Sequence, residues 1–185
     1  GASRSGIADW VFDASGWHAA AGTMGIMLAG NDGWVIRGCH FLNQPDSGSP
    51  DQGGIDFEAQ GENCLVDKCV FRNNAGAAIE VLGLRSPQAR NVHIRGCKFD
   101  RNNWAYKNGP AEIPIWGTPN SAAEVCCSNG RIEENGYVLV PGVPFYINES
   151  RSTNDWTLVG NRAFDFSEDL DAAFPYLDPP SITVC

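Results

Sequence analysis

An apolar motif of eight residues recurs about every 30 residues and constrains the fold of this chain more than any other feature. Its copies are WVIRGCHF (34–41), CLVDKCVF (64–71), VHIRGCKF (92–99), VCCSNGRI (125–132) and WTLVGNRA (156–163), with a weaker copy at 7–12. The copies end at Phe41, Phe71, Phe99, Ile132 and Ala163, which are 30, 28, 33 and 31 residues apart. Short β-type patches at this period, without helical periodicity, predict a β-solenoid of stacked coils.

A second strand is expected after each of the first five copies, counting the weak one. These strands are GIMLAG (25–30), GIDFEAQG (54–61), AIEVLG (78–83), EIPIWG (112–117) and YVLVPG (137–142). Side chains alternate between the two faces of a strand, so each segment directs two apolar side chains inward and the residues between them outward. A coil therefore consists of strand, turn, strand and turn, with loops of variable length.

The pattern Ile-x-x-Cys/Asn-x-Phe followed by Gly-Ile resembles the repeats of the pectate-lyase-like superfamily. The resemblance implies an all-β, right-handed parallel β-helix of about six coils over residues 1–166, and a carbohydrate-active protein outside the cell. Residues 167–185 leave the repeat and are expected to form a C-terminal cap segment, beginning with a short helix that Ser167 N-caps. Residues 1–6 begin in mid-coil, so we expect further coils upstream, or a partner chain, at this open edge.

Cysteines occupy an inward column of the repeat. Cys39, Cys69 and Cys97 are expected to stack as small buried residues, with Asn161 continuing the column. The chain has seven cysteines, an odd number, so at least one thiol is free or pairs between chains.

The formal net charge of −9 argues against nucleic acid as a partner. Since no apolar run approaches ~18 residues, no membrane-spanning helix is expected.

The second strands bring acidic residues together. Asp56 and Glu80 are expected to be outward neighbours on adjacent coils, with Cα atoms ~4.8 Å apart, and Glu58 lies beside them. Like charges directly opposite each other destabilise a sheet, so a shared proton, a bound cation or a substrate is expected to offset the repulsion. The first strands differ, because their column Arg37, Asp67, Arg95 alternates in sign as an ordinary surface does.

Three interpretations of the carboxylates remain open. The first is a solvated acidic face, and the second is a calcium site formed by Asp56, Glu58 and Glu80. The third is a glycosidase pair, in which a separation of ~5–5.5 Å implies retention of anomeric configuration and ~6.5–9.5 Å implies inversion. Asp56 with Glu80 suits the shorter separation, which favours retention, and Asp56 with Glu58 suits the longer one.

The 24-residue spacing of Asp56 and Glu80 also resembles the arrangement in retaining β-xylosidases with a parallel β-helix. That resemblance implies Asp56 as nucleophile and Glu80 as acid/base. Glu58 is expected to support them by raising the pKa of Glu80 or by binding a sugar hydroxyl, and no cofactor is expected unless the site holds calcium.

Aromatic residues near the same strands are candidate substrate-binding groups. Trp116 is expected to point outward two coils from Glu58, while Trp104 and Tyr106 lie in the loop 101–112. The expected partner is a polysaccharide or oligosaccharide. The alternatives to a glycoside hydrolase are a calcium-dependent polysaccharide lyase and a non-catalytic structural, adhesive or carbohydrate-binding module.

Overall fold

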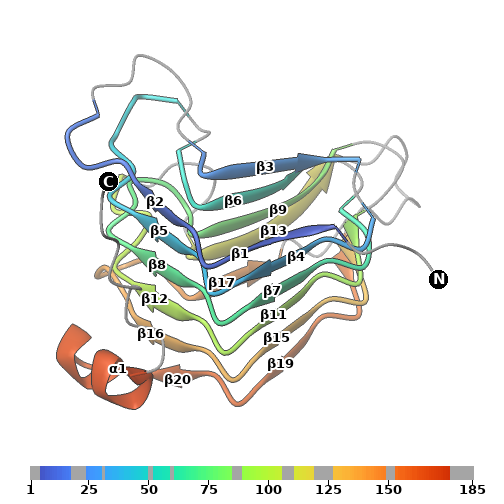
Figure 1. Cartoon of the computed structure of the whole chain (residues 1–185). Coiled ribbons are helices and arrows are strands. Elements are labelled where there is room, and N and C mark those ends of the chain that lie inside the picture. The colour runs from blue at the N-terminus through green and yellow to red at the C-terminus, as the bar shows by residue number, and fades with distance from the viewer. Residues whose placement is uncertain are drawn as a thin grey trace.

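The chain forms a parallel β-helix, seen in the computed structural model in Figure 1. The structure describes residues 5–17, 24–30, 32–49, 52–58, 61–84, 89–105, 111–118, 127–148 and 153–175. All pairings between its strands are parallel. Two sheets have six strands each and a third has five, which confirms the predicted fold of about six coils.

Three large sheets form the walls of the helix. Sheet A contains β1 (Gly6–Ala8), β4 (Val35–Arg37), β7 (Leu65–Asp67), β11 (His93–Arg95), β15 (Arg131–Glu133) and β19 (Thr157–Val159). Sheet B contains β2 (Val11–Asp13), β5 (His40–Leu42), β8 (Val70–Arg72), β12 (Lys98–Asp100), β16 (Gly136–Val138) and β20 (Arg162–Ala163). Sheet C contains β3 (Ile26–Ala29), β6 (Ile55–Glu58), β9 (Ile79–Leu84), β13 (Ile113–Thr118) and β17 (Tyr146–Asn148).

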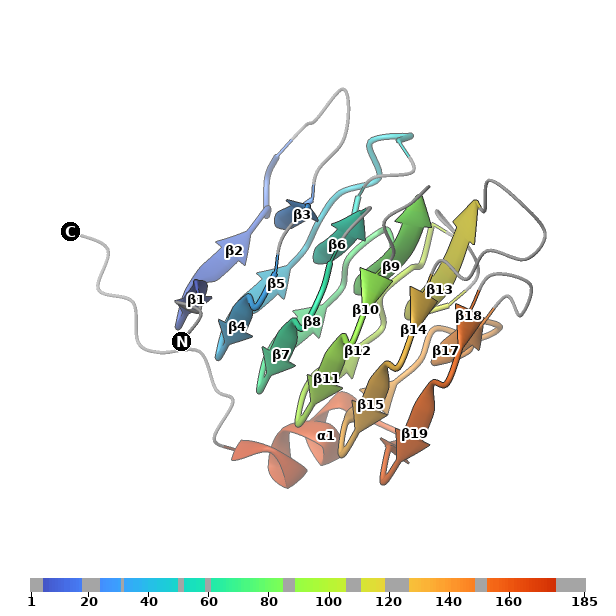
Figure 2. The ribbon, with the colours of Figure 1, turned by 90° about the vertical axis from the view of Figure 1, so that its right-hand side faces the viewer.

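A fourth, smaller sheet joins sheet C to sheet A. It is formed by β10 (Ala89–Arg90), β14 (Cys127–Ser128) and β18 (Thr153–Asn154). Figure 2 shows the coils from the side, with these three strands between the strands of sheets C and A.

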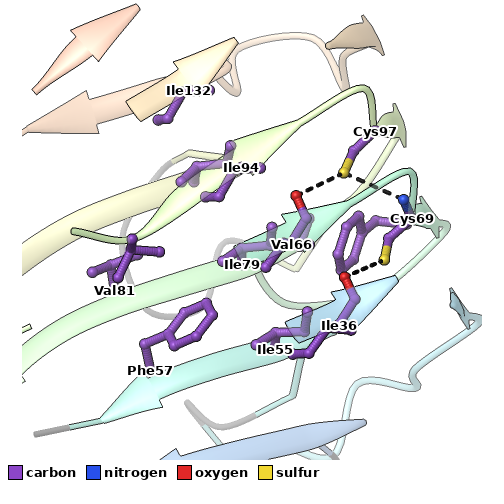
Figure 3. Close-up of a cluster of buried hydrophobic side chains, with 14 of the residues drawn as sticks. Ile36, Ile55, Phe57, Val66, Cys69, Ile79, Val81, Ile94, Cys97 and Ile132 are labelled. Carbon is purple, nitrogen blue, oxygen red and sulfur yellow. Dashed lines mark hydrogen bonds between the residues drawn. The ribbon is translucent and has the colours of Figure 1, made fainter. Parts of the chain in front are cut away.

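Equivalent apolar residues stack inside the coils, as the repeat predicts. Phe12, Phe41, Phe71 and Phe99 form a column of parallel rings whose consecutive centroids are 5.0, 5.0 and 5.1 Å apart. Cys39, Cys69 and Cys97 form the predicted cysteine column and are fully buried. Figure 3 shows that the sulfur of Cys97 accepts a hydrogen bond from the backbone N–H of Cys69, at 3.3 Å.

Asparagine side chains satisfy backbone groups at the turns, where neighbouring coils leave N–H groups without a sheet partner. Asn135 Oδ1 accepts from the N–H of Cys97 at 2.9 Å, and Asn161 Oδ1 accepts from the N–H of Asn135 at 3.2 Å. Asn161 therefore continues the cysteine column as predicted, with Asn135 between them. The exposed turn residue Asn73 has a φ of 55°, in the left-handed region that asparagine tolerates better than most residues.

The fifth coil departs from the predicted register by five residues. Ile132 pairs with Ile94 in sheet A, and Tyr137 rather than Ile132 pairs with Phe99 in sheet B. The apolar first position of this copy is held by Gly130, where an added Cβ would lie 2.3 Å from the Trp156 ring. The Trp156 ring of the next coil fills the space that a side chain at position 130 would occupy. The fifth coil therefore lacks the apolar first residue by which the repeat is recognised in the sequence.

The prediction of a second strand at 137–142 is consequently wrong. Val138 lies at an outward position of sheet B, opposite Asp100, and the fifth strand of sheet C is β17. The four other second strands are confirmed, with Ile55, Phe57, Ile79 and Val81 among their fully buried residues.

The helix α1 (Ser167–Ala173) runs alongside the coils (Figure 2). Its N-cap is Phe166 rather than the predicted Ser167, and no side chain caps it. Leu170 packs against Gly136 of β16, while Asp171 pairs with Arg72 at 2.8 Å and Lys98 at 3.1 Å. The described part of the predicted cap therefore lies on the outer face of sheet B, and residues 176–185 are outside the described part. Among the described segments, no helix has the length and apolar character needed to cross a membrane.

Candidate functional site

Sheet C brings the predicted carboxylates together on its outer face. Asp56 on β6 pairs in register with Glu80 on β9, and Glu58 pairs with Leu82 on the same two strands. The predicted neighbours are therefore confirmed as neighbours. Asp56 is only 1% exposed and Glu80 is 0% exposed, whereas Glu58 is partly exposed. The interpretation as a solvated acidic face is wrong for the Asp56–Glu80 pair, because the folded chain buries both.

The local sequence explains why these side chains point away from the core. Ile55 and Phe57 alternate with Asp56 and Glu58, and both apolar side chains are fully buried inside the coil. Gly54 brings β6 close to its neighbours, since a Cβ there would lie 2.5 Å from both Ala78 O and Phe71 Cδ1. Close packing at Gly54 thus holds the start of β6 against its neighbours, and alternation along the strand directs Asp56 outward.

The neighbours of the pair differ on its two sides. Met27 of β3 pairs with Asp56 from the first coil and is 51% exposed. On the other side, the register of β9 with β13 places the buried Pro114 next to Glu80. Met27 is therefore the exposed neighbour of a buried pair, and the buried Pro114 lies on its other side.

The described carboxylates are not grouped in the way that a metal site requires. Within the residues that the structure describes, no group of three or more His, Cys, Asp and Glu side chains is arranged to hold a metal ion. The calcium site predicted from Asp56, Glu58 and Glu80 is thus not supported by the geometry. Two adjacent buried negative charges would repel each other strongly, which distinguishes this pair from an ordinary surface pair.

Of the three aromatic residues predicted to bind substrate, the structure describes the side chain of Trp104 only. Trp104 is 41% exposed, and its indole N–H donates to the backbone carbonyl of Asn73 at 3.4 Å. The backbone of Trp116 pairs with Leu82, which confirms its place two coils from Glu58, but its side chain is outside the described part. Tyr106 is also outside the described residues.

A buried carboxyl that was not predicted lies at the start of β13. Glu112 is fully buried, and its Oε1 accepts a hydrogen bond from the N–H of Asn102 at 2.9 Å. Burial raises the pKa of Glu112 to about 8; the Asn102 hydrogen bond opposes this shift and the nearby Asp100 adds to it. One feature of the sequence could have indicated this buried carboxyl. The residue directly before the inward isoleucine is Gly54 or Ala78 in the two preceding coils, but it is the acidic Glu112 before Ile113.

The charged column on sheet A is the surface that the sequence predicted. Arg37 and Arg95 bond the carboxylate of Asp67 through their Nε atoms, at 2.8 and 3.0 Å. Burial raises the pKa of Asp67, but the two guanidinium groups outweigh it and hold that pKa below its usual value. The column is a paired ladder and contributes no group to the site on sheet C.

Comparison with known proteins supports the fold. A family model described as right handed beta helix region matches residues 11–113, which is more than half of the 185 residues. No curated protein and no solved structure shows significant similarity to the chain. The stacked parallel sheets and this match agree, and the chain belongs to the right-handed beta helix family.

Proposed function

We propose that the chain hydrolyses a glycosidic bond in a polysaccharide or oligosaccharide, with Asp56 and Glu80 as the catalytic pair. The observation that carries this proposal is the register of Asp56 with Glu80 on adjacent strands of sheet C. Strands in a sheet are ~4.8 Å apart, which is close to the ~5–5.5 Å between the carboxyl groups of retaining glycosidases. Retention of configuration follows from that separation.

The proposed reaction has two steps. An Asp56 oxygen attacks the anomeric carbon, and Glu80 gives its proton to the leaving glycosidic oxygen, so that a glycosyl ester forms at Asp56. Glu80 then takes a proton from water, which attacks the same carbon and releases Asp56 as carboxylate. A buried pair that shares one proton supplies the required starting state, with one acid and one carboxylate.

Because Asp56 and Glu80 are buried, the proposal requires side chains over them to move before a substrate can bind, and we assign access to the side of Met27. This half-exposed side chain lies beside Asp56 and offers an apolar surface to a sugar face. Glu58, partly exposed at the far end of β6, is placed to accept a hydrogen bond from a sugar hydroxyl. We also propose that the protein is extracellular, which is consistent with a soluble polysaccharide as its substrate.

The test is turnover on a panel of aryl glycosides and polysaccharides by the wild type, Glu80→Gln and Asp56→Asn. Glu80→Gln keeps the shape and removes the acid, so we expect a loss of at least ~10²-fold on substrates with poor leaving groups. Aryl glycosides with good leaving groups need less protonation, and Glu80→Gln should retain more activity on them. Asp56→Asn should lose activity on both kinds of substrate.

Glu168→Gln is the matched control, because Glu168 is an exposed carboxylate on α1, away from sheet C. Equal activity of Glu80→Gln and Glu168→Gln would exclude Glu80 as the acid. Absence of turnover by the wild type across the panel would contradict the hydrolase, and release of unsaturated products would replace it with a lyase.

A further inference from the structure

A cavity of about 300 Å³ opens beside the first two coils. Its lining residues are Phe12, Asp13, Ala14, Trp17, Met24, Gly25 and Gln44. Trp17 is 66% exposed, so much of the indole is accessible to solvent. The volume is at the lower end of the range for small-ligand sites, and the lining combines an aromatic wall with a few polar groups.

Two polar residues line the cavity. Gln44 is only 6% exposed as a residue and lines the cavity. A side-chain amide at a cavity wall can bond a ligand through its two N–H donors and its carbonyl oxygen. The Asp13 carboxylate is held in place by Ser15 Oγ at 2.6 Å and by Asn43 Nδ2 at 3.0 Å.

An exposed hydrogen-bonded ladder leads from this cavity along the coils. Asn43 donates to Asp13, and Asn73 donates to Asn43 Oδ1 at 2.9 Å. The ladder ends at Trp104, whose indole N–H donates to the carbonyl of Asn73. The ladder therefore runs from Asp13 at the cavity to Trp104 over three coil spacings, or ~14 Å.

The cavity lies next to the coil that carries the catalytic pair. Met24 Sδ accepts a hydrogen bond from the backbone N–H of Gly53 at 3.0 Å. Gly53 precedes Asp56 by three residues, which corresponds to ~10 Å along an extended chain. A ligand in the cavity is thus within a few sugar units of Asp56.

We propose that the cavity and the ladder form a binding track for a neutral glycan, with one sugar ring against Trp17 and the chain running toward Trp104. This proposal rests on the proposed function, because it assigns the substrate class of the same enzyme. Aromatic faces and amide groups are the partners that sugar rings and hydroxyls use. A neutral glycan is favoured over an acidic one, because the Asp13 carboxylate and the net charge of −9 repel anions.

Binding is measured in the Glu80→Gln background by isothermal titration calorimetry, so that turnover does not consume the probe. The probes are xylohexaose, cellohexaose, mannohexaose and chitohexaose, with trigalacturonate as the acidic comparison. We expect one of the neutral probes to bind, and both Trp17→Ala and Gln44→Leu to weaken that binding about 10-fold or more, which is ~1.4 kcal/mol. Trp104→Ala should weaken the hexasaccharide but not the matching disaccharide.

Phe166→Ala is the control, because Phe166 has the same 66% exposure as Trp17 but lies before α1, away from the cavity. Unchanged affinity in Trp17→Ala and Gln44→Leu, failure of every neutral probe, or tighter binding of trigalacturonate would overturn the track. Failure of the proposed hydrolase can be distinguished from failure of the binding track. If the wild type cleaves nothing but Trp17→Ala still loses binding, the proposed hydrolase fails and the track stands in a non-catalytic carbohydrate-binding module.

Discussion

Glu112 Oε1 accepts the backbone N–H of Asn102 at 2.9 Å and thereby ends a ladder that asparagines form in the preceding coils. In that ladder, Asn74 Oδ1 accepts from the N–H of Gln44 at 3.1 Å, and Asn102 Oδ1 accepts from the N–H of Asn74 at 3.2 Å. The next coil has no asparagine at this position, and the buried carboxyl group of Glu112, directly before β13, supplies the missing acceptor.

Stability should depend on pH through Glu112. The folded protein keeps this proton up to about pH 8, whereas the unfolded chain releases it near the ordinary glutamate pKa of 4.5. Between these two pH values folding takes up a proton. The contribution of Glu112 to the free energy of unfolding is therefore complete below about pH 4.5 and decreases as the pH rises to about 8. In this range the free energy of unfolding falls by up to ~1.4 kcal/mol per pH unit because of Glu112. Glu112→Gln should abolish that fall. Urea unfolding from pH 4 to 9 checks it, and parallel curves for both proteins would contradict it.

The buried asparagine ladder should contribute more to stability than the exposed asparagines. Asn74→Ala removes the acceptor of the Gln44 N–H and a donor to the Phe41 carbonyl, both in the interior. We expect a loss of about 1–3 kcal/mol in the free energy of unfolding. Asn63→Gly is the control, because Asn63 is an exposed residue. Its backbone is in the left-handed region, with a φ of 53°, and glycine adopts that conformation freely. Equal destabilisation by the two variants would show that the ladder carries no special weight.

Asp171 should fix α1 to sheet B. Asp171→Asn leaves the Lys98 ammonium, which is 2% exposed, without its charge partner. We expect destabilisation of about 1–3 kcal/mol and faster amide exchange in α1. Asp169→Asn on the exposed side of the same helix should change little. Burial raises the pKa of Asp171, but Lys98 and Arg72 lower it below 3.8, so the contribution persists above that pH and is lost only in stronger acid.

The thiols should be unreactive in the folded protein. Cys39, Cys64, Cys69, Cys97 and Cys127 are free and buried. Burial raises the pKa of Cys64 and Cys69, which reduces the reactive thiolate further. Titration with a disulfide reagent should find at most two of the seven cysteines before unfolding. Rapid reaction of three or more in the native state would contradict the buried column.

The sequence predicts those parts of the fold that repeat. Phe41, Phe71 and Phe99 mark equivalent positions because each must fill the same space between coils, and the cysteine column follows for the same reason. The fifth coil was misaligned because Trp156 fills the space above Gly130, so that one coil supplies the apolar group for another. Such an exchange depends on contacts between coils and leaves no local pattern.

The site was predicted as far as strand register allows. The pairing of Asp56 with Glu80 follows from the repeat, but their burial does not, since alternation shows only which residues leave the core. Glu112 and Gln44 were missed for a related reason. Glu112 matters because it accepts the backbone N–H of Asn102, ten residues earlier in the same coil, and Gln44 matters because it lines a cavity. The spacing of the repeat encodes neither relationship.

Trapping of the glycosyl ester tests the catalytic assignment most directly. The wild type is incubated with a 2-deoxy-2-fluoro glycoside of the sugar that it cleaves, and the labelled peptide is mapped by mass spectrometry. The account predicts one sugar per chain, attached to Asp56, and no labelling of Asp56→Asn. A label on another carboxylate, or hydrolysis with inverted configuration and no trapped ester, would contradict Asp56 as the nucleophile.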